Sequence, residues 1–204
     1  WLPRQRWFGG KDGPIDELAI GTAIALRSGD PALHHLILDV RQNGVTDHYQ
    51  LLLGVRRELP HRLRHVEIGT VHGAFVYDAA HDADLTRILL DALAAEAAVG
   101  PLRFRRAGGA GIRTDLTSLP ITAEQSNTSL LFGDTYICKL FRRLSQGVNL
   151  DLEVNLALTR RGCPHVPAVH GWIELEPGPG ARDGGTGEPV TLALLSDYLH
   201  TGAD

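Results

Sequence analysis

The sequence predicts an α+β fold in two parts, an antiparallel sheet with a covering helix followed by a five-stranded sheet with one main helix. Three observations support this prediction. Asn43-Gly44 stands between two strand-like runs, which is the strongest short signal for a β-hairpin. Apolar residues from Leu85 to Leu93 recur at helical spacing. From Leu119 onward, three strand-like runs, a helical run and two more strand-like runs follow in that order.

The composition is that of a soluble globular protein, with 204 residues, 43% hydrophobic and 22% charged. The net charge of −4 gives no reason to expect nucleic acid or a membrane surface as a partner. No apolar run is long enough to span a bilayer, and two cysteines without a Cys-x-x-Cys pattern favour a reducing, cytoplasmic setting. His61 and His65 have helical spacing, and His34 and His35 form a pair. Neither set has a Glu or Cys beside it in a metal-ligand pattern, so we interpret these histidines as surface residues. The chain starts at Trp1 and contains no Met, so we expect part of a longer protein.

The first part is expected to span residues 1–100. An Asp near the start of its helix and Gly100-Pro101 at the end are suitable helix boundaries. The sheet beneath that helix would bury one apolar face. Its strands are predicted at 18–26, 33–40, 47–55 and 73–80.

The second part is expected to span residues 101–204. The glycine-rich stretch 107–113 contains no complete G-x-G-x-x-G, and no helix opens behind it, so we interpret it as a linker. Asn149 is a suitable N-cap for the main helix, with Asp151 and Glu153 in its first turn. The predicted strands are 119–125, 129–134, 135–141, 170–176 and 190–199, the helix is 150–162, and 177–189 is a polar loop.

The order of strands and helix in the second part matches the small lobe of a protein-kinase-like fold. In that fold a strand-borne lysine holds nucleotide phosphates, and a glutamate on the next helix holds the lysine. Lys139 and Glu153 follow in this order, and Lys139 is one of two lysines in a chain rich in arginine. Period-2 alternation predicts that Cys138 and Leu140 face away from Lys139. Two alternatives stay open. Lys139 could be a strand residue that faces solvent, and Glu153 could interact only with the positive end of the helix dipole.

A small polar run stands before the second of these strands. Its hydroxyl and amide groups could hydrogen-bond phosphate oxygens, although the run lacks glycine. An ordinary polar turn is the alternative. The run comprises Ser126, Asn127, Thr128 and Ser129.

Three blocks of the sequence resemble the actinobacterial maltokinases, a family of aminoglycoside-phosphotransferase-like kinases, including those fused to trehalose synthases. The blocks are WLPRQRWFGGKDG, EQSNTSLLFGDTYICKLFRRLSQGVNLDLEVNLALTRRGCPHV and LLSDYLHTGAD. The resemblance implies an N-terminal cap and the small lobe of a two-lobed kinase. Such a kinase transfers the γ-phosphate of ATP, with Mg²⁺, to maltose and forms maltose 1-phosphate.

The same resemblance implies roles for individual residues. Lys139 would hold the phosphates and pair with Glu153, and the four residues from Ser126 to Ser129 would form the phosphate loop. Trp7 and Phe8, in the cap signature, would have a packing role. Asp197, Tyr198 and Leu199 would form the hinge, whose backbone binds the adenine edge.

One departure from the family concerns the chemistry itself. The sequence contains no His-Gly-Asp catalytic loop, and the family's catalytic Asp, Mg²⁺ ligand and maltose site belong to the C-terminal lobe. We therefore expect no catalytic residue and no metal ligand in this chain, weak ATP binding and no turnover. A related kinase for another sugar, such as glucosamine, stays open. A non-catalytic module whose cap docks onto a partner such as trehalose synthase also stays open, and a Lys139–Glu153 ion pair beside Ser126–Ser129 would favour the kinase.

Overall fold

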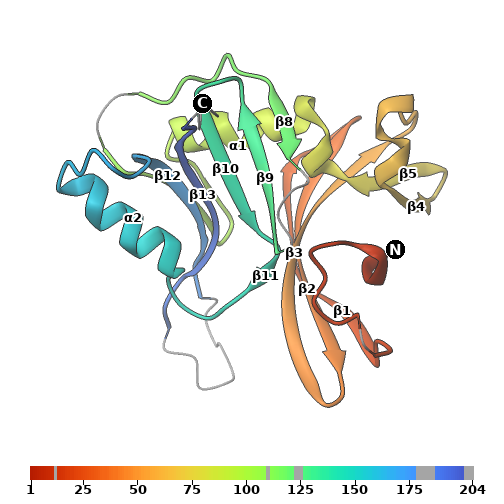
Figure 1. The fold of residues 1–204 in the computed structure, drawn as a ribbon. Coiled ribbons are helices and arrows are strands. Elements are labelled where there is room, and N and C mark those ends of the chain that lie inside the picture. The colour runs from red at the N-terminus through yellow and green to blue at the C-terminus, as the bar shows by residue number, and fades with distance from the viewer. Residues whose placement is uncertain (12, 109–110, 122–125, 178–186, 200–204) are drawn as a thin grey trace, which may run out of the picture.

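The computed structural model describes residues 1–11, 13–108, 111–121, 126–177 and 187–199. These residues form two antiparallel sheets that face each other, with one helix at the top of the molecule and another on its outer side (Figure 1). The α+β class predicted from the sequence is therefore confirmed at this level. The second half of the predicted strand 119–125 and most of the predicted loop 177–189 lie outside the described residues.

The first sheet has the strand order β1-β2-β3-β5-β4, with β11 paired to β3. The predicted hairpin joins β2 to β3, and Gln42 lies opposite Val45. Asn43 and Gly44 both have positive φ, as a two-residue hairpin turn requires. The strands are β1 (Glu17–Arg27), β2 (Ala32–Gln42), β3 (Val45–Arg56), β4 (Glu67–Val71), β5 (Ala74–Asp78) and β11 (Arg143–Leu144).

Among the described residues the second sheet has seven strands, in the order β6-β7-β12-β13-β10-β9-β8, so the prediction of five strands is wrong. The additional pair comes from the residues just before the predicted linker. In β7, Leu102 and Phe104 are buried and alternate with arginines, a period-2 pattern that the predicted helix end and linker obscured. The strands are β6 (Ala98–Val99), β7 (Leu102–Arg106), β8 (Ser118–Ile121), β9 (Asn127–Phe132), β10 (Tyr136–Phe141), β12 (Val169–Leu175) and β13 (Val190–Asp197).

Helix α1 (Ala83–Ala94) begins at Asp82, whose side chain accepts a hydrogen bond from the Asp84 amide. The helix packs against β7, β8 and β12 of the second sheet, so it is not primarily the cover of the first sheet. The Thr86 and Ser118 hydroxyls, 2.6 Å apart, tie it to β8. Four leucines on one face of the helix are buried in the core that the two sheets share, which explains its position. They are Leu85, Leu89, Leu90 and Leu93.

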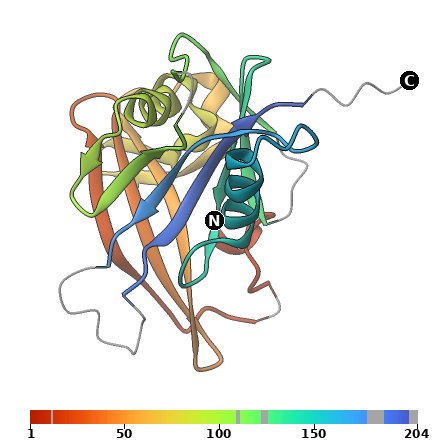
Figure 2. The same ribbon diagram turned by 90° about the vertical axis from the view of Figure 1, so that its left-hand side faces the viewer.

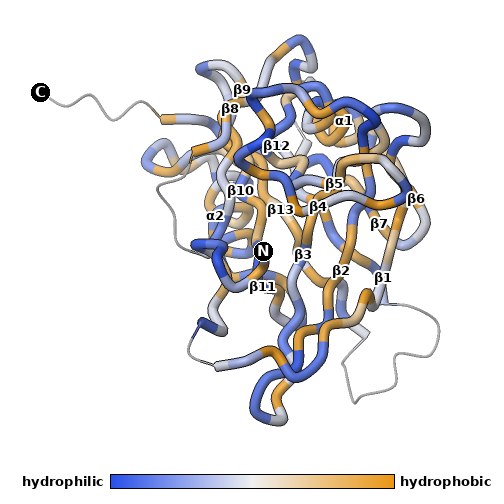
Figure 3. Tube along the Cα trace, turned by 90° about the vertical axis from the view of Figure 1, so that its right-hand side faces the viewer, coloured by the Kyte–Doolittle hydropathy of each residue, from blue (hydrophilic) through white to orange (hydrophobic). Residues whose placement is uncertain are grey.

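The two sheets share one hydrophobic core, and each outer face has a cover of its own. The hydrophobic stretches of the trace follow the strands at the centre of the molecule (Figure 3). The N-terminal segment, with η1 (Leu2–Arg4), Trp7 and Phe8, covers the outer face of the first sheet. Both aromatic residues contact Tyr49 and are buried, which confirms their packing role. Helix α2 (Leu150–Arg160) lies along the outer face of the second sheet (Figure 2).

Short 3-10 helices connect the strands of the first sheet to each other and to α1. They are η2 (His61–Val66) and η3 (Ala79–His81). None of the helices in the described ranges is long and apolar enough to cross a membrane.

The chain passes from the second sheet directly into the first sheet at the end of β10. After β10 ends at Phe141, β11 joins the first sheet and pairs with Tyr49 and His48 of β3. Gln50 strengthens this junction: its amide nitrogen donates to the carbonyls of Phe141 and Leu192. The Gln50 carbonyl oxygen, 2.9 Å from His35 Nε2, therefore accepts a hydrogen bond from a neutral imidazole.

His35 is buried, so its interpretation as a surface residue is wrong. It is expected to make the protein sensitive to acid. Burial lowers its pKa to about 4, although the bond to Gln50 opposes that shift. Between pH 6.5 and about 4 the unfolded chain binds a proton at this site and the folded chain does not, so the free energy of unfolding falls as the pH falls. The shift corresponds to roughly 3 kcal/mol over that range. Urea denaturation at pH 7.5, 6 and 5 should show this slope, and it should be reduced in His35→Gln.

The matched control for this measurement is His61→Gln, because His61 is exposed. Its pH dependence should follow that of the unaltered protein. An equal slope in His35→Gln and the unaltered protein would contradict the assignment to His35.

Candidate functional site

Lys139 lies in the middle of β10 on the face of the second sheet that α2 covers. Directly opposite it are Ser129 of β9 and Leu194 of β13. Cys138 and Leu140 point into the shared core, as the alternation predicted. The Lys139 side chain is 35% exposed, so it is partly accessible to solvent.

The structure pairs Lys139 with Asp151 and not with Glu153. Lys139 Nζ lies 3.6 Å from Asp151 Oδ2, and among the described residues no ion pair joins Lys139 to Glu153. The reason is the phase of the helix. Residues two apart in an α-helix point about 200° away from each other, so with Asp151 toward β10, Glu153 faces solvent. The predicted N-cap is correct, since Asn149 Oδ1 accepts from the Asp151 amide and fixes this first turn.

The predicted phosphate loop is mostly strand. Asn127, Thr128 and Ser129 belong to β9, and only Ser126 precedes it. Asn127 and Ser129 share the Lys139 face, because Asn127 lies opposite Phe141 and Ser129 opposite Lys139. Thr128 points the other way, is 7% exposed and accepts a hydrogen bond from Arg142. A free loop of four phosphate ligands is therefore wrong for Thr128 and Ser129.

An open depression lies beside Lys139 at the start of α2. Its volume is about 730 Å³, within the range of small-molecule sites. Ser126 and Asn127 contribute polar groups from the start of β9, and Asp151 contributes one from the first turn of α2. Arg143 also lines the depression and is paired with Asp47 at 2.7 Å. The depression thus combines polar side chains with the N-terminus of α2.

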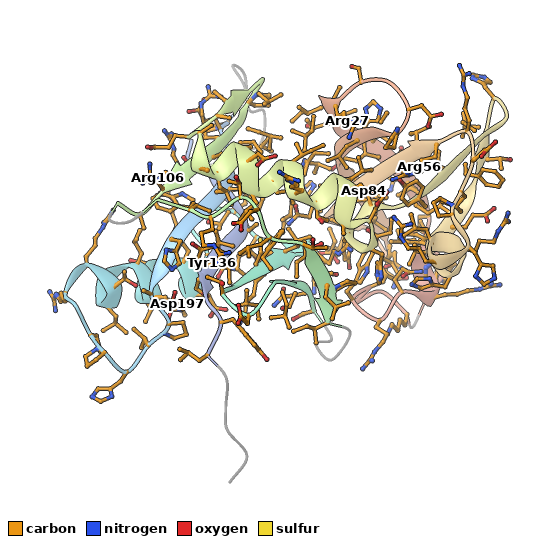
Figure 4. All side chains as sticks on the ribbon, turned by 90° about the horizontal axis from the view of Figure 1, so that it is seen from above. Arg27, Arg56, Asp84, Arg106, Tyr136 and Asp197 are labelled. Carbon is orange, nitrogen blue, oxygen red and sulfur yellow. The ribbon has the colours of Figure 1, made fainter. Side chains whose placement is uncertain are left out.

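The three predicted hinge residues lie at the far end of the same pair of strands. Asp197 pairs with Tyr136, and the two lie close together at the end of the second sheet in Figure 4. The Asp197 carboxylate is 2.6 Å from His170 Nε2. The Tyr198 amide donates to the carbonyl of Thr135, and Leu199 is 55% exposed.

Lys139 and this hinge are separated by a distance that suits an extended ligand. From Tyr136 to Lys139 the strand rises about 10 Å. The structure therefore places Lys139 and Asp197–Leu199 along one strand pair, β10 and β13.

Arg142 is a structural residue next to the site that the sequence did not indicate. Its side chain is 1% exposed, and Nη2 lies 2.7 Å from Asp78 Oδ2. Nε lies 2.7 Å from the Thr128 hydroxyl, and the guanidinium stacks 4.8 Å above the ring of Trp7. The residue therefore links the N-terminal segment, β5 and the start of β9. Arg142 and Arg143 are adjacent, and the sequence does not indicate which of the two is buried.

A metal centre is not formed by the described residues. No group of three or more His, Cys, Asp or Glu side chains among them could hold a metal ion. The acidic residue nearest to Lys139 is Asp151, which is already engaged in the ion pair.

Comparison with solved structures finds a protein of similar fold. A structure titled glucosamine kinase (crystal form A) superposes with a TM-score of 0.52 over 88% of this chain, with 19% sequence identity. At that identity the likeness establishes the fold alone. The chain spans 32% of the length of that kinase.

Comparison with protein families finds a match in the first part of the chain. Residues 1–82 match the Maltokinase N-terminal cap domain. The match supports the resemblance of this segment to a maltokinase-type N-terminal cap. The segment contains the first sheet except β11, together with the N-terminal residues that include Trp7 and Phe8.

Proposed function

We propose that this chain is the nucleotide-binding portion of an ATP-dependent kinase that phosphorylates maltose to maltose 1-phosphate. The observation that carries the proposal is the position of Lys139. It stands on the face of the second sheet that α2 covers, between a polar depression at the start of α2 and Asp197–Leu199 at the other end of the strand pair. The maltokinase-type cap and the kinase fold support the same function.

Each residue has a role that its position allows. ATP supplies the phosphoryl group, and Lys139 neutralises charge on its α- and β-phosphates. Asp151 holds the ammonium group in place, while Ser126 and Asn127 donate to phosphate oxygens from the opposite side of the depression. At the far end, the backbone of Asp197–Leu199 binds the adenine edge. Thr128 and Ser129 contribute only by holding β9.

The magnesium ligands, the catalytic carboxylate and the sugar site are assigned to the part of the kinase that this chain does not contain. The described residues offer no group of three ligands for Mg²⁺. The glucosamine kinase that shares the fold is about three times as long as the segment it shares with this chain. On this proposal, the chain alone binds ATP weakly and does not turn over.

The acceptor is tested with the complete kinase that carries this chain. Phosphate transfer from ATP should be measured over a panel that includes maltose, glucose, trehalose and glucosamine. Maltose is expected to give the highest kcat/KM. Preference for glucosamine would overturn the proposed sugar, and no transfer to any acceptor would overturn the proposed kinase.

A matched pair of substitutions on α2 tests the role of Asp151. Asp151→Asn is expected to raise the KM for ATP by about two- to fivefold, because an exposed ion pair contributes roughly 0.2–1 kcal/mol. Glu153→Gln removes the same charge two residues away and is expected to change KM little, because Glu153 faces solvent. Steady-state kinetics at saturating sugar would measure both. A larger effect for Glu153→Gln would restore Glu153 as the partner of Lys139.

A further inference from the structure

Strand β1 is the long outer edge of the first sheet. Its 11 residues pair with β2 on one side, and among the residues that the structure describes no strand pairs with it on the other. In Figure 3 it lies outermost, beyond β2 and β3. The backbone N–H and C=O groups along such an edge are a template on which one more strand can form.

The other described edges of the two sheets are less suited to pairing. Strands β4, β6 and β8 have only 5, 2 and 4 residues, and β8 contains Pro120, which lacks a backbone donor. Short edges and proline prevent association from edge to edge. Strand β1 contains neither proline nor lysine. It does have two irregularities of register, which leave Gly21 and Leu26 without a partner in β2, and bulges of this kind can also protect an edge.

In β1, however, the two irregularities make the strand symmetric about its centre. Nine of its residues have a partner in β2, and Thr22 is the fifth of the nine. Glu17 and Arg27 are the first and the ninth, so each stands four positions from Thr22 and on the same face of the sheet. A second β1 that runs antiparallel, with its Thr22 opposite this one, would therefore bring Glu17 of each copy opposite Arg27 of the other.

The apolar residues of β1 fit the same pairing. Leu18 and Ile20 are 53% and 61% exposed, on the face of the sheet that the N-terminal segment covers further in. In the symmetric register they would lie opposite Ala25 and Ala23 of the second copy, which are also exposed. Each large side chain would thus meet a small one, and the pairing would remove apolar surface from water.

We propose that β1 is a dimerisation strand, which pairs antiparallel with β1 of a second copy of this chain about Thr22. The first sheets of the two copies would then form one continuous sheet across a two-fold axis. The occupant is a second copy because the strand is complementary to itself: its acidic end meets its basic end, and its exposed large residues meet its alanines. One strand pair is a small interface, so the Kd is expected to be roughly micromolar.

Sedimentation equilibrium of the 204-residue chain, from low micromolar to nearly millimolar concentration, tests the proposal first. A reversible equilibrium between monomer and dimer is expected. A chain that stays monomeric over the whole range would overturn the proposal and leave the edge to a strand of another protein. Assembly that continues beyond the dimer would also overturn it, because a two-fold pairing of one edge closes with two copies.

Reversal of the charges tests the register. Glu17→Arg and Arg27→Glu each turn both cross-strand ion pairs into contacts between like charges, and each should weaken the dimer by at least about tenfold. An equimolar mixture of the two variants should form a heterodimer as tight as the dimer of the unaltered chain, because every reversed charge then faces its opposite. No recovery on mixing would overturn the pairing about Thr22.

The control for these reversals is Arg41→Gln. Arg41 lies 3.0 Å from Glu17 within the same chain, but it belongs to β2 and has no counterpart across the proposed axis. Its substitution should leave the dimer intact. A loss equal to that of Glu17→Arg would show that the contact within the chain is what matters, and would overturn the proposal.

A matched pair of apolar positions tests the edge itself. Ile20→Lys places a charge within the proposed contact and should weaken the dimer on the order of tenfold. Val71→Lys makes the same change on β4, at the opposite edge of the first sheet, where Val71 is 54% exposed. It should leave the dimer unchanged, and both variants should keep the thermal midpoint of the unaltered chain. Equal weakening by the two variants would overturn the assignment to β1.

Discussion

Lys139→Ala in the complete kinase is expected to lower kcat for ATP-dependent phosphorylation by about 10²–10³, the cost of losing one well-placed group that stabilises transition-state charge. The side chain stands on a strand whose opposite face is fixed in the core by Cys138 and Leu140. Its loss should therefore remove a charge without disturbing the fold. Steady-state phosphorylation of maltose and a denaturation midpoint for the same variant would measure both effects.

Two further variants make this result specific. Lys139→Arg keeps the positive charge but replaces a compact ammonium group with a planar guanidinium, so partial activity is expected. Arg41→Ala removes an exposed positive charge from the first sheet, far from β10 in the sheet order, and should leave kcat unchanged. Normal turnover in Lys139→Ala would remove the main support for the kinase proposal.

Arg142→Met is expected to destabilise the protein by about 3–5 kcal/mol. The substitution leaves the carboxylate of Asp78 buried without its partner, and that uncompensated charge is the main cost. It also removes the donor to Thr128 and the group stacked on Trp7. For a chain of this size the midpoint of thermal unfolding should fall by roughly 6–20 °C. Thermal unfolding followed by tryptophan fluorescence, which reports on Trp7, would measure the change.

The neighbouring arginine provides the control. Arg143→Met removes a side chain of the same size and charge, but Arg143 is 56% exposed in its pair with Asp47. Its loss should cost no more than about 1 kcal/mol. Equal destabilisation by the two variants would contradict the assignment of the buried network to Arg142.

The parts of the fold that local patterns determine could be predicted from the sequence. Asn43-Gly44 fixed the hairpin, because few residue pairs tolerate positive φ at both turn positions. Asn149 marked the start of α2, because its side chain caps the first turn. Period-2 alternation around Lys139 correctly separated the two faces of β10.

The parts that depend on long-range packing could not be predicted in the same way. Strand β7 was missed because its two buried residues stand among arginines, next to a glycine-rich stretch. Helix α1 was assigned to the first sheet because amphipathic spacing shows which face is buried but not what covers it.

The candidate site shows the same limit. The order of strand and helix indicated a lysine and an acidic partner, but not the phase of α2, which selects Asp151 over Glu153. The sequence did not show that Thr128 is buried, because its hydrogen-bond partner Arg142 lies fourteen positions further along the chain. The division at residue 100, and the binding of ATP itself, stay predictions.

The passage of the chain from β10 into β11 has a consequence for how the two halves fold. The cap ends at residue 82 by family comparison, yet its sheet is completed by β11, and its buried Asp78 is neutralised by Arg142. The segment that matches the family is therefore shorter than the segment needed to complete the first sheet. A fragment that stops at residue 82 would lack β11, the counter-charge from Arg142 and the core residues that α1 and the second sheet contribute. We expect such a fragment to remain unfolded, and calorimetry of the whole chain to show one cooperative transition.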